Sequence, residues 1–488
     1  MKQSLVNVRR LPIRLTGDDR RVIARPFIMS GARCQSVLQR IEDLDDEEVI
    51  EILNEVRHDF ASRHRNADAI FDENYRAAAS LIGWKNDWEL NRRMLAGSYF
   101  TMEYAIDSAA LFNPSIVAHP DQSNVPPGGL RFVMSLRATG EGHVSSVAFR
   151  TGILTRECDV LIDPPPIRLH RSRVKPDKRY VKSLFIQKLQ EIGILHDAVE
   201  RVFSGIAENF TIVDLRQAIE QVRPHLTEVA GSSEVLRTML WLATSNYHIE
   251  LSPDATLSEL VIFPMSEDDS HGIEDVRLVR FVNDDGTHQY YGTYTAYNGV
   301  RTLPMMLATC DFHSIEIHSL NGGGAANKGM ALFPRKIGGQ YVMCSRIDGE
   351  NLFISTSDSA DFWEGATRLV SPKFAWEFMQ IGNCGSPIET DEGWLLLTHG
   401  VGPMRTYSIS AVLLDKNDPL KIIAQLPEPL IEPSESEREG YVPNVVYTCG
   451  ALIHDNMLYV PYAQADKSTS MAIVKVDELL NALLDHKN

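Results

Sequence analysis

DEGWLLLTHG, residues 391–400, follows a plan that occurs five times in this chain: a tight polar turn, a run of apolar residues, and a polar or charged residue where the run ends. The other occurrences are GGLRFVMSLR (128–137), DGTHQYYGTYTAYNG (285–299), GGQYVMCSR (338–346) and HDNMLYVPYAQAD (454–466). The last four segments begin roughly fifty to sixty residues apart, a spacing typical of stacked units that cannot bury their apolar faces alone. Four-stranded blades around a channel fit this spacing. The repeats therefore predict a mainly β fold, a propeller of five blades.

The polar residues that end the five runs are the first candidates for function, because in a propeller such positions could converge on the mouth of one channel. They are Arg137, Asn298, Arg346, His399 and Asp466. A lone histidine at a strand end is more often a packing or hydrogen-bonding residue than a catalyst, so both interpretations stay open for His399.

The composition indicates an ordinary globular protein and excludes several classes of function. The chain has 488 residues, of which 44% are hydrophobic and 23% charged, and a formal net charge of -17. This acidity argues against a nucleic-acid partner, since phosphate backbones attract basic surfaces. No apolar run is long enough for a signal peptide or a membrane span, which predicts a cytoplasmic protein without membrane contact. The six cysteines are scattered without metal-ligand spacing, so neither a metal site nor a disulfide framework is expected.

Two stretches of helical periodicity interrupt the β texture and divide the chain. We expect residues 1–100 to hold short strands and a helical extension, which covers the main domain or could equally form a homo-oligomer contact. Residues 101–475 are expected to be the propeller domain, and residues 476–488 a final amphipathic helix. A helical insertion at about 176–247 explains why the first two repeats lie further apart than the rest.

The densest polar motif is GIEDVR (272–277), in which Glu274, Asp275 and Arg277 precede an apolar run. In a regular strand Glu274 and Asp275 point to opposite faces, whereas Asp275 and Arg277 share one face. Asp275 paired with Arg277 would stay ionised, and would need burial or a second carboxylate to act as an acid. A structural salt bridge at a strand edge explains the same pattern.

Basic residues gather at two further hairpins. Lys328 and Arg346 flank one of them, and Arg137 and Arg150 end two consecutive apolar runs in SLRATGEGHVSSVAFRTG (135–152). Arginine offers a planar fork of donors that suits phosphate or carboxylate. Solvated surface cations are the alternative interpretation. Motifs of serine hydrolases, P-loop proteins, zinc proteases and dinucleotide-binding proteins are absent.

Several segments in fixed order resemble the signature segments of glycoside hydrolase family 130. They are ALFNPSIVAHPDQ (110–122), FVMSLRATGEGHVSSVAFRTG (132–152), GIEDVR (272–277), YGTYTAYNG (291–299), KGMALFPRKIGGQYVMCSR (328–346), GSPIETDEGWLLLTHGV (385–401) and GYVPNVVYTCGALIHDNMLYVPYAQAD (440–466). The resemblance covers about 100–470 and implies a five-bladed propeller that acts on β-mannosides with inversion. Most members are phosphorylases, which release α-mannose 1-phosphate with inorganic phosphate, and some are hydrolases.

The resemblance also implies roles for individual residues. The catalytic aspartate of the family's GxEDPR motif corresponds to Asp275, and Val276 stands here in place of the proline. In the family's phosphorylases this acid passes its proton to the glycosidic oxygen through a sugar hydroxyl. The phosphate pocket corresponds to Arg137, Arg150, Lys328, Arg346 and His399. Substrate contacts are expected from Asn113, Glu274, Arg277, Tyr297 and Asp466.

The nucleophile separates two activities. Phosphate requires cations beside the anomeric carbon, whereas water requires a carboxylate base on the face opposite the leaving group. Glu103 and Glu389 are the candidate bases for the hydrolase. The set of basic residues favours phosphorolysis of β-mannooligosaccharides, with inorganic phosphate as co-substrate and no cofactor. The helical additions resemble those of the longer family members that act on β-1,2-linked mannooligosaccharides, which favours this linkage. A carbohydrate-binding propeller without catalysis is a further alternative. A binder needs neither the acid nor the anion pocket, so the presence of both favours an enzyme.

Overall fold

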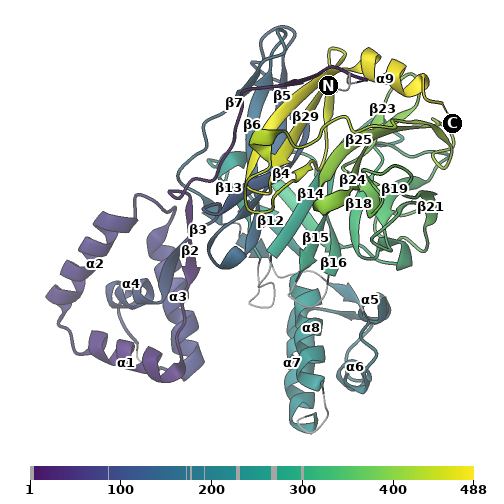
Figure 1. Ribbon diagram of the computed structural model, residues 1–488. Helices are drawn as coiled ribbons and strands as arrows, with labels where there is room; N and C mark the ends of the chain where they lie inside the picture. The colour runs from purple at the N-terminus through teal and green to yellow at the C-terminus, as the bar shows by residue number, and fades with distance from the viewer. Residues whose placement is uncertain are drawn as a thin grey trace.

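The computed structural model describes residues 5–85, 87–171, 173–175, 179–191, 193–226, 231–264, 272–297 and 302–487. Antiparallel sheets make up the larger body, and helices gather in two groups beside it (Figure 1). The prediction of a mainly β chain with helical additions is therefore confirmed. The five-bladed arrangement of its strands stays a prediction.

The strands occur in groups along the chain, and each group pairs mainly within itself. The first group holds β4 (Ala110–Ala118), β5 (Leu130–Thr139), β6 (Ser145–Leu154) and β7 (Val160–Ile162). The second holds β14 (Gly272–Val282), β15 (His288–Tyr297), β16 (Thr302–Thr309) and β17 (Ser314–Ser319), and it joins the first through a parallel contact of β14 with β6. The short strands β8 (His170–Arg171), β9 (Arg173–Lys175), β12 (Tyr247–Glu250) and β13 (Leu260–Ile262) extend the resulting twelve-stranded sheet.

Three further groups follow in chain order. The third holds β18 (Lys328–Leu332), β19 (Tyr341–Arg346), β20 (Leu352–Ser357) and β21 (Thr367–Val370). The fourth holds β22 (Gln380–Asn383), β23 (Ile388–Glu389), β24 (Trp394–Val401), β25 (Tyr407–Leu414) and β26 (Ile422–Gln425). The fifth holds β27 (Val446–Tyr447), β28 (Leu452–His454), β29 (Met457–Gln464) and β30 (Ser468–Lys475). Every residue of β24, and every residue of β30 but the last, is buried, which indicates that these strands are covered on both faces, as in stacked sheets.

The fifth group also takes in the beginning of the chain. Strand β1 (Val8–Arg10) pairs antiparallel with β30, Val8 opposite Val474. The same group contacts the first one, because the backbone N–H of Cys449 donates to the carbonyl of Pro114 at 2.8 Å. The hydroxyl of Thr469 likewise donates to the carbonyl of Leu111 at 3.0 Å. The first and last strand groups therefore lie side by side.

The N-terminal helices form a unit with a core of its own (Figure 1). The unit contains α1 (Gly31–Glu42), α2 (Asp46–Phe60), α3 (Ala67–Ile82) and α4 (Leu90–Tyr99), and the two-stranded sheet of β2 (Val22–Pro26) and β3 (Thr101–Ala105) connects it to the larger body. Helix α2 begins at a capping box, in which Asp45 and Glu48 satisfy each other's backbone N–H groups. Leu38, Leu53 and Phe71 are buried between the helices, which explains the helical periodicity of this stretch.

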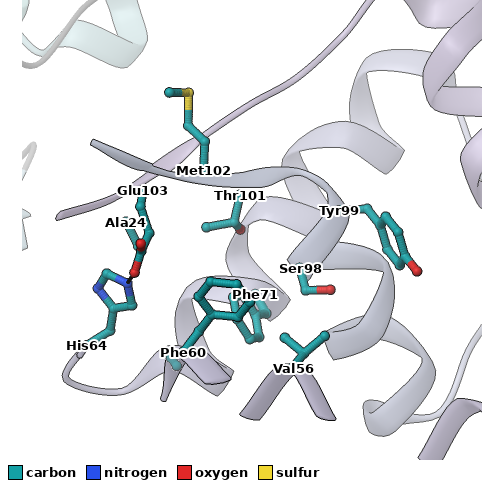
Figure 2. Close-up of a pocket in the computed structure, with 11 residues that line it drawn as sticks. Ala24, Val56, Phe60, His64, Phe71, Ser98, Tyr99, Thr101, Met102 and Glu103 are labelled. Atoms are coloured by element: carbon teal, nitrogen blue, oxygen red, sulfur yellow. Dashed lines mark hydrogen bonds and ion pairs between the residues drawn. The ribbon is translucent and has the colours of Figure 1, made fainter. Parts of the chain in front are cut away.

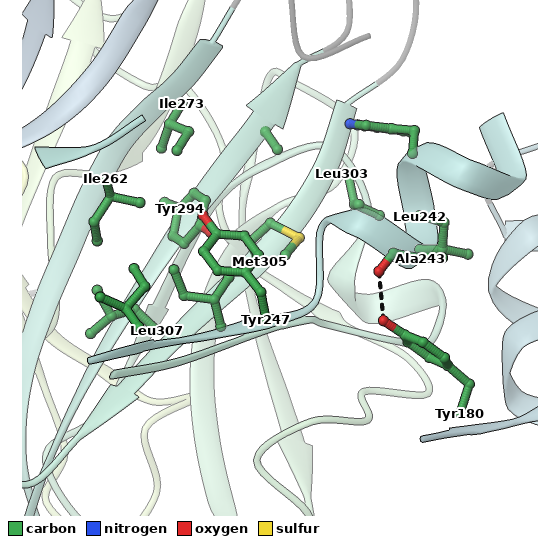
Figure 3. Close-up of a cluster of buried hydrophobic side chains, with 14 of the residues drawn as sticks. Tyr180, Leu242, Ala243, Tyr247, Ile262, Ile273, Tyr294, Leu303, Met305 and Leu307 are labelled. Atoms are coloured by element: carbon green, nitrogen blue, oxygen red, sulfur yellow. Dashed lines mark hydrogen bonds between the residues drawn. The ribbon is translucent and has the colours of Figure 1, made fainter. Parts of the chain in front are cut away.

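The second helical group lies between the first two strand groups in the chain. It contains α5 (Lys182–Glu191), α6 (Asp197–Phe203), α7 (Ile212–Val222) and α8 (Ser232–Thr244), with the short strands β10 (Tyr180–Val181) and β11 (Asn209–Phe210). Figure 3 shows where it meets the sheet: Leu242 and Tyr247 lie beside Leu303 and Met305 of β16 in one buried cluster. The insertion thus shares a hydrophobic core with the strands it interrupts.

The last helix, α9 (Val476–Leu484), packs its apolar side on the fourth and fifth strand groups through Leu479 and Leu483. Among the residues that the structure describes, no helix has the length and apolar character needed to cross a lipid bilayer.

Candidate functional site

Two strand irregularities position the first pair of candidate residues. The pairing of β14 with β15 shifts register around Asp275, and the pairing of β4 with β5 shifts around Asn113. Both residues adopt left-handed backbone, with φ of 56° and 48°, which Asp and Asn tolerate better than most residues. Bulges of this kind re-aim a side chain. Here they bring the two side chains together, and Nδ2 of Asn113 donates to Oδ1 of Asp275 at 2.7 Å.

The bulge corrects the expectation that Glu274 and Asp275 point to opposite faces. Both carboxylates contact the same guanidinium, because Nη2 of Arg137 lies 3.1 Å from Oε1 of Glu274 and Nη1 lies 3.5 Å from Oδ1 of Asp275. The alternation of side chains holds only for a regular strand, and the extra residue in β14 breaks it. Arg137 therefore connects the two carboxylates of the GIEDVR motif.

The expected pairing of Asp275 with Arg277 takes a different form. Nη1 of Arg277 donates to the backbone carbonyl of Asp275 at 3.0 Å, Nε donates to the carbonyl of Cys384 at 2.9 Å, and Nη2 donates to Oη of Tyr447 at 2.8 Å. Arg277 is buried, so these hydrogen bonds hold the backbone of the bulge in place. Its charge acts on Asp275 without a direct contact between the side chains.

Three more of the predicted residues, Lys328, Arg346 and His399, are connected to Glu274 by a chain of contacts. Nζ of Lys328 lies 2.6 Å from Oε2 of Glu274, so this carboxylate bridges Lys328 and Arg137. Lys328 stands opposite Arg346 in the pairing of β18 with β19. Nη1 of Arg346 donates to Nε2 of His399 on β24 at 2.9 Å. Residues from four strand groups thus meet at one cluster.

Several buried polar atoms of this cluster have no hydrogen-bond partner within the described part of the chain. They include Oδ1 of Asn113, Nε of Arg137, Nε of Arg346 and both amide atoms of Asn383. Buried polar groups are normally hydrogen-bonded. The cluster therefore has donors and acceptors available to a polar ligand, and two of the donors are cationic.

Two carboxyl groups of the site, Asp275 and Asp466, have pKa values shifted in opposite directions. Burial alone would raise the pKa of Asp275, but the charges of Arg137 and Arg277 and the hydrogen bond from Asn113 outweigh it and hold that pKa below its usual value. Burial and the negative charge of Asp275 raise the pKa of Asp466 to about 6. At neutral pH Asp275 is ionised, and Asp466 is the first of the two to take a proton as the pH falls.

His399 enters the cluster as a neutral group. Burial and the positive charges of Arg346 and Arg277 hold the pKa of His399 well below its usual value. Its Nε2 accordingly accepts a hydrogen bond from Arg346. The ring therefore orients the cation Arg346 and adds no charge of its own, and the place of His399 in a phosphate pocket stays a prediction.

The remaining expected substrate contacts lie at the edge of the cluster. Asp466 sits in the turn between β29 and β30 with a φ of 50°, and its carboxyl feels the charge of Arg137. Nζ of Lys328 lies 6.0 Å from the centre of the Tyr297 ring. Asn298 falls outside the described residues.

Arg150 lies in another cluster. Its Nη1 donates to the carbonyl of Phe149, and its Nη2 lies 3.7 Å from Asp107, which also binds Arg21 at 2.6 Å. All three charged side chains of this second cluster are buried. This placement does not favour the prediction that Arg150 binds phosphate, and we leave it out of the set.

The two candidate bases are also engaged elsewhere. Figure 2 shows Glu103 in a cavity of about 390 Å³ between the N-terminal helices and β3, where its carboxylate binds His64 at 2.7 Å. Arg63 binds the other carboxylate oxygen at 2.8 Å. Glu389 forms a two-pronged ion pair with Arg335. Neither contact set includes a residue of the cluster around Asp275.

Tyr447 is a residue of the cluster that the sequence did not single out. Besides accepting from Arg277, its ring meets that of His399 edge-on, with centroids 5.0 Å apart. Burial raises the pKa of Tyr447 above its usual value, so it remains a neutral phenol. The segment VVYTCG (445–450) has no charged residue or turn signal that would have marked it.

Comparisons with known proteins agree on one kind of activity. A family model described as beta-1,4-mannooligosaccharide phosphorylase, glycoside hydrolase family 130, matches residues 248–485. The chain is 34% identical to a 1,2-beta-oligomannan phosphorylase of Thermoanaerobacter sp. (strain X514) over 227 residues, which are 46% of this chain and 75% of that protein. It is 31% identical to a beta-1,4-mannooligosaccharide phosphorylase of Ruminococcus albus over 253 residues, 49% of this chain and 74% of that protein.

Among solved structures, the beta-1,2-mannobiose phosphorylase of Listeria innocua in complex with beta-1,2-mannobiose is similar with a TM-score of 0.45. Its sequence is 20% identical, and the likeness covers 78% of this chain and 93% of that one.

Proposed function

This chain belongs to glycoside hydrolase family 130 and is an enzyme that acts as a phosphorylase or a hydrolase, and we propose that it is a phosphorylase of β-mannosides. It would transfer a mannosyl group to inorganic phosphate with inversion and release α-mannose 1-phosphate. No cofactor takes part. The observation that carries this proposal is the cluster in which Asp275 faces the cations Arg137, Lys328 and Arg346.

The electrostatics of the cluster support a dianionic co-substrate. Four cations, Arg137, Arg277, Lys328 and Arg346, stand against the three carboxylates of Glu274, Asp275 and Asp466, so positive charge exceeds negative charge even when Asp466 is ionised. Nε of Arg346 and Nε of Arg137 have no partner in the described chain and are donors that suit phosphate oxygens. Donors fixed in advance toward developing charge are the largest common source of rate enhancement.

The proposed reaction moves one proton and one glycosyl group. A phosphate oxygen attacks the anomeric carbon from the side opposite the leaving group, and the bond to the glycosidic oxygen breaks. Asp275 gives its proton to that oxygen through a hydroxyl of the bound sugar. The proton carried by hydrogenphosphate then restores the acid, so the products are mannose 1-phosphate and the shortened alcohol. Asn113, positioned by its own bulge, holds the carboxyl of Asp275.

Asp275 must be protonated to act as an acid, although the free site holds it ionised. A bound phosphate dianion offsets the charges of Arg137 and Lys328 that lower this pKa. Binding of phosphate therefore raises the pKa of Asp275, so this carboxyl group becomes protonated only when the nucleophile is bound.

This coupling predicts that a dianion binds more tightly as the pH falls. Sulfate is the suitable probe, because phosphate itself titrates in this range. As the pH is lowered from 8 toward 4, the affinity of the protein for sulfate should rise with uptake of up to one proton, and each unit by which the dianion raises the pKa of Asp275 contributes at most about tenfold. Calorimetry in two buffers of different ionisation enthalpy measures both quantities.

Two variants show which carboxyl group takes up the proton when sulfate binds. Asp275→Asn should abolish most of the uptake, and Asp466→Asn should leave it largely in place. If the uptake persists in Asp275→Asn and disappears in Asp466→Asn, the proton resides on Asp466 and the proposed coupling is wrong. A pH-independent affinity in the unchanged protein would contradict it as well.

We propose β-1,2-linked mannooligosaccharides as the preferred substrates. Two of the similar proteins at 34% and 35% identity are named for β-1,2-linked substrates, and the one at 31% for β-1,4-linked ones. The helical additions support an oligosaccharide substrate, since they could form walls around a chain longer than a disaccharide.

The hydrolase remains the alternative because Asp466 lies close enough to Asp275 for its pKa to respond to that charge. With a pKa of about 6, Asp466 is mostly ionised at neutral pH and could serve as the base that activates water. The two activities differ in their requirement for phosphate.

The deciding experiment incubates the protein with β-1,2-mannobiose, with and without phosphate. We expect α-mannose 1-phosphate, identified by ³¹P and ¹H NMR, only when phosphate is present, and slower turnover of β-1,4-mannobiose. Release of free mannose at the same rate without phosphate would show a hydrolase. Faster turnover of the β-1,4-linked disaccharide would overturn the proposed linkage.

We also propose that the five strand groups are the blades of a propeller, with residues 101–475 as the catalytic domain. The contact of the first with the fifth group and the pairing of β1 with β30 support a closed ring. The meeting of Asn113, Asp275, Lys328 and His399, which come from four of the groups, supports a common centre.

A further inference from the structure

A groove follows the junction between the helical insertion and the strand ends. Its first part is a cavity of about 460 Å³ between Lys188 and Glu191 of α5, Thr302 of β16 and the loop that runs from Gly322 to Asn327. Its second part is a cavity of about 290 Å³ that includes His318 and Asn321. Lys188 lines both parts, so they adjoin. We call the two parts together the insertion groove; α5 lies below β16 in Figure 1.

At one end of the insertion groove, two lining residues are direct neighbours of site residues in the chain or in the sheet. Asn327 lines the groove and is followed by Lys328, whose Nζ binds Glu274 at 2.6 Å. Thr302, on another wall, stands opposite Tyr297 in the pairing of β15 with β16. We therefore expect a ligand that extends from the cluster in this direction to enter the groove.

Charges of both signs line the insertion groove: Arg179 and Lys188 are cations, and Glu191, Glu316 and Asp361 are carboxylates. Nζ of Lys188, which is 4% exposed, lies 3.3 Å from Glu191, and Nε2 of His318 lies 2.7 Å from Asp361. Such a lining has little net attraction for an ion. It offers donors next to acceptors, which suits hydroxyl groups because each hydroxyl both donates and accepts. The amides of Asn321 and Asn327 add to this character.

The groove lies where the part of the chain that the family model matches meets a part that it does not match. The family model matches residues 248–485, whereas α5 with Lys188 and Glu191 lies outside that range. One wall therefore comes from the matched part and the other from the insertion.

We propose that the insertion groove binds the sugar units of a mannooligosaccharide that lie beyond the bond being cleaved, and so sets a preference for substrates longer than a disaccharide. The proposal rests on the proposed function, because it takes the ligand of the groove to be the remainder of that substrate. The groove is polar, has lining charges of both signs and begins beside residues that adjoin the cluster, which are properties that suit a chain of neutral sugars.

The test fills the groove without touching the catalytic cluster. Ala326 lines the first part and is exposed, so Ala326→Trp places a large side chain in the path of a longer substrate. We expect kcat/KM for β-1,2-mannotetraose to fall by about tenfold or more while that for β-1,2-mannobiose changes by less than about twofold, a loss equal to one or two hydrogen bonds. Ala326→Ser is the matched control and should change neither value.

A second variant removes a polar contact without adding bulk. Lys188→Met keeps the buried stem and loses the charge, and should lower kcat/KM for the tetraose alone, whereas Arg216→Met, on the exposed side of α7, should have no effect. An equal fall for both substrates, or none in either variant, would overturn the proposal.

Direct binding separates this proposal from the proposed function. If the unchanged protein turns over neither sugar, the proposed function fails, and calorimetry with β-1,2-mannotetraose still tests the groove. Binding that Ala326→Trp weakens at least fivefold supports the groove in that case. Binding that is absent, or equal in the two proteins, overturns it.

Discussion

Asp275→Asn is expected to lower kcat/KM for β-1,2-mannobiose by about 1,000-fold, within the range of 10²–10⁴ that general acid catalysis contributes. The amide cannot supply the proton that the leaving oxygen needs. It keeps the shape of the side chain and can still accept the hydrogen bond from Asn113, so the bulge should be preserved. Steady-state kinetics measure the loss, and thermal unfolding monitors the fold.

A substrate with a good leaving group distinguishes an acid from a structural residue. With 2,4-dinitrophenyl β-mannoside the departing oxygen needs little protonation, so the loss in Asp275→Asn should shrink to about tenfold or less. Asp284→Asn, at the far end of the same hairpin, is the control and should retain full activity. An equal loss with both substrates would show that Asp275 acts on binding or structure, and more than a few per cent of residual activity on mannobiose would remove it as the acid.

Arg137→Met should have the second largest effect. Arg137 contacts both Glu274 and Asp275 and has a free Nε donor, so its loss removes charge-assisted hydrogen bonds to the dianion, each worth about 1.5–3 kcal/mol. The KM for phosphate should therefore rise by about 100-fold. The pKa of Asp275 should rise as well, because Arg137 is the largest of the charges that lower it.

The control for this prediction lies on the same strand. Arg131→Met removes an arginine from the other end of β5 and should leave the KM for phosphate unchanged. If Arg137→Met changed kcat/KM for mannobiose at saturating phosphate but not the KM for phosphate, the anion would be held by other groups. Lys328 and Arg346 would then be the residues to replace next.

The repeats could be recognised from the sequence because turn residues and apolar runs leave a period that does not depend on tertiary contacts. The geometry of the site was harder to predict from the sequence. The bulges at Asn113 and Asp275 are single extra residues, and no periodic pattern records them. They decide that Glu274 and Asp275 share Arg137, which a regular strand would forbid.

The two arginines of the first hairpin show the same limit. Arg137 stands opposite Val147, so Arg150, an odd number of residues further on, points to the other face of the sheet. The register of that hairpin could not be derived from the sequence, since its turn contains several glycines. The sequence therefore identified two arginines of suitable chemistry, and only the pairing of β5 with β6 separated them.

The pairing of β1 with β30 has a consequence for synthesis on the ribosome. The two strands are separated by roughly 460 residues, so at about 5–20 residues per second β1 waits on the order of half a minute or more for its partner. During that delay the strand has an unsatisfied edge, whereas the helices that follow it already own a core and can fold at once. The N-terminal helices of the nascent chain can thus fold first, and the pairing of β1 with β30 forms last. In the interval between these two events chaperones can protect the unpaired strand.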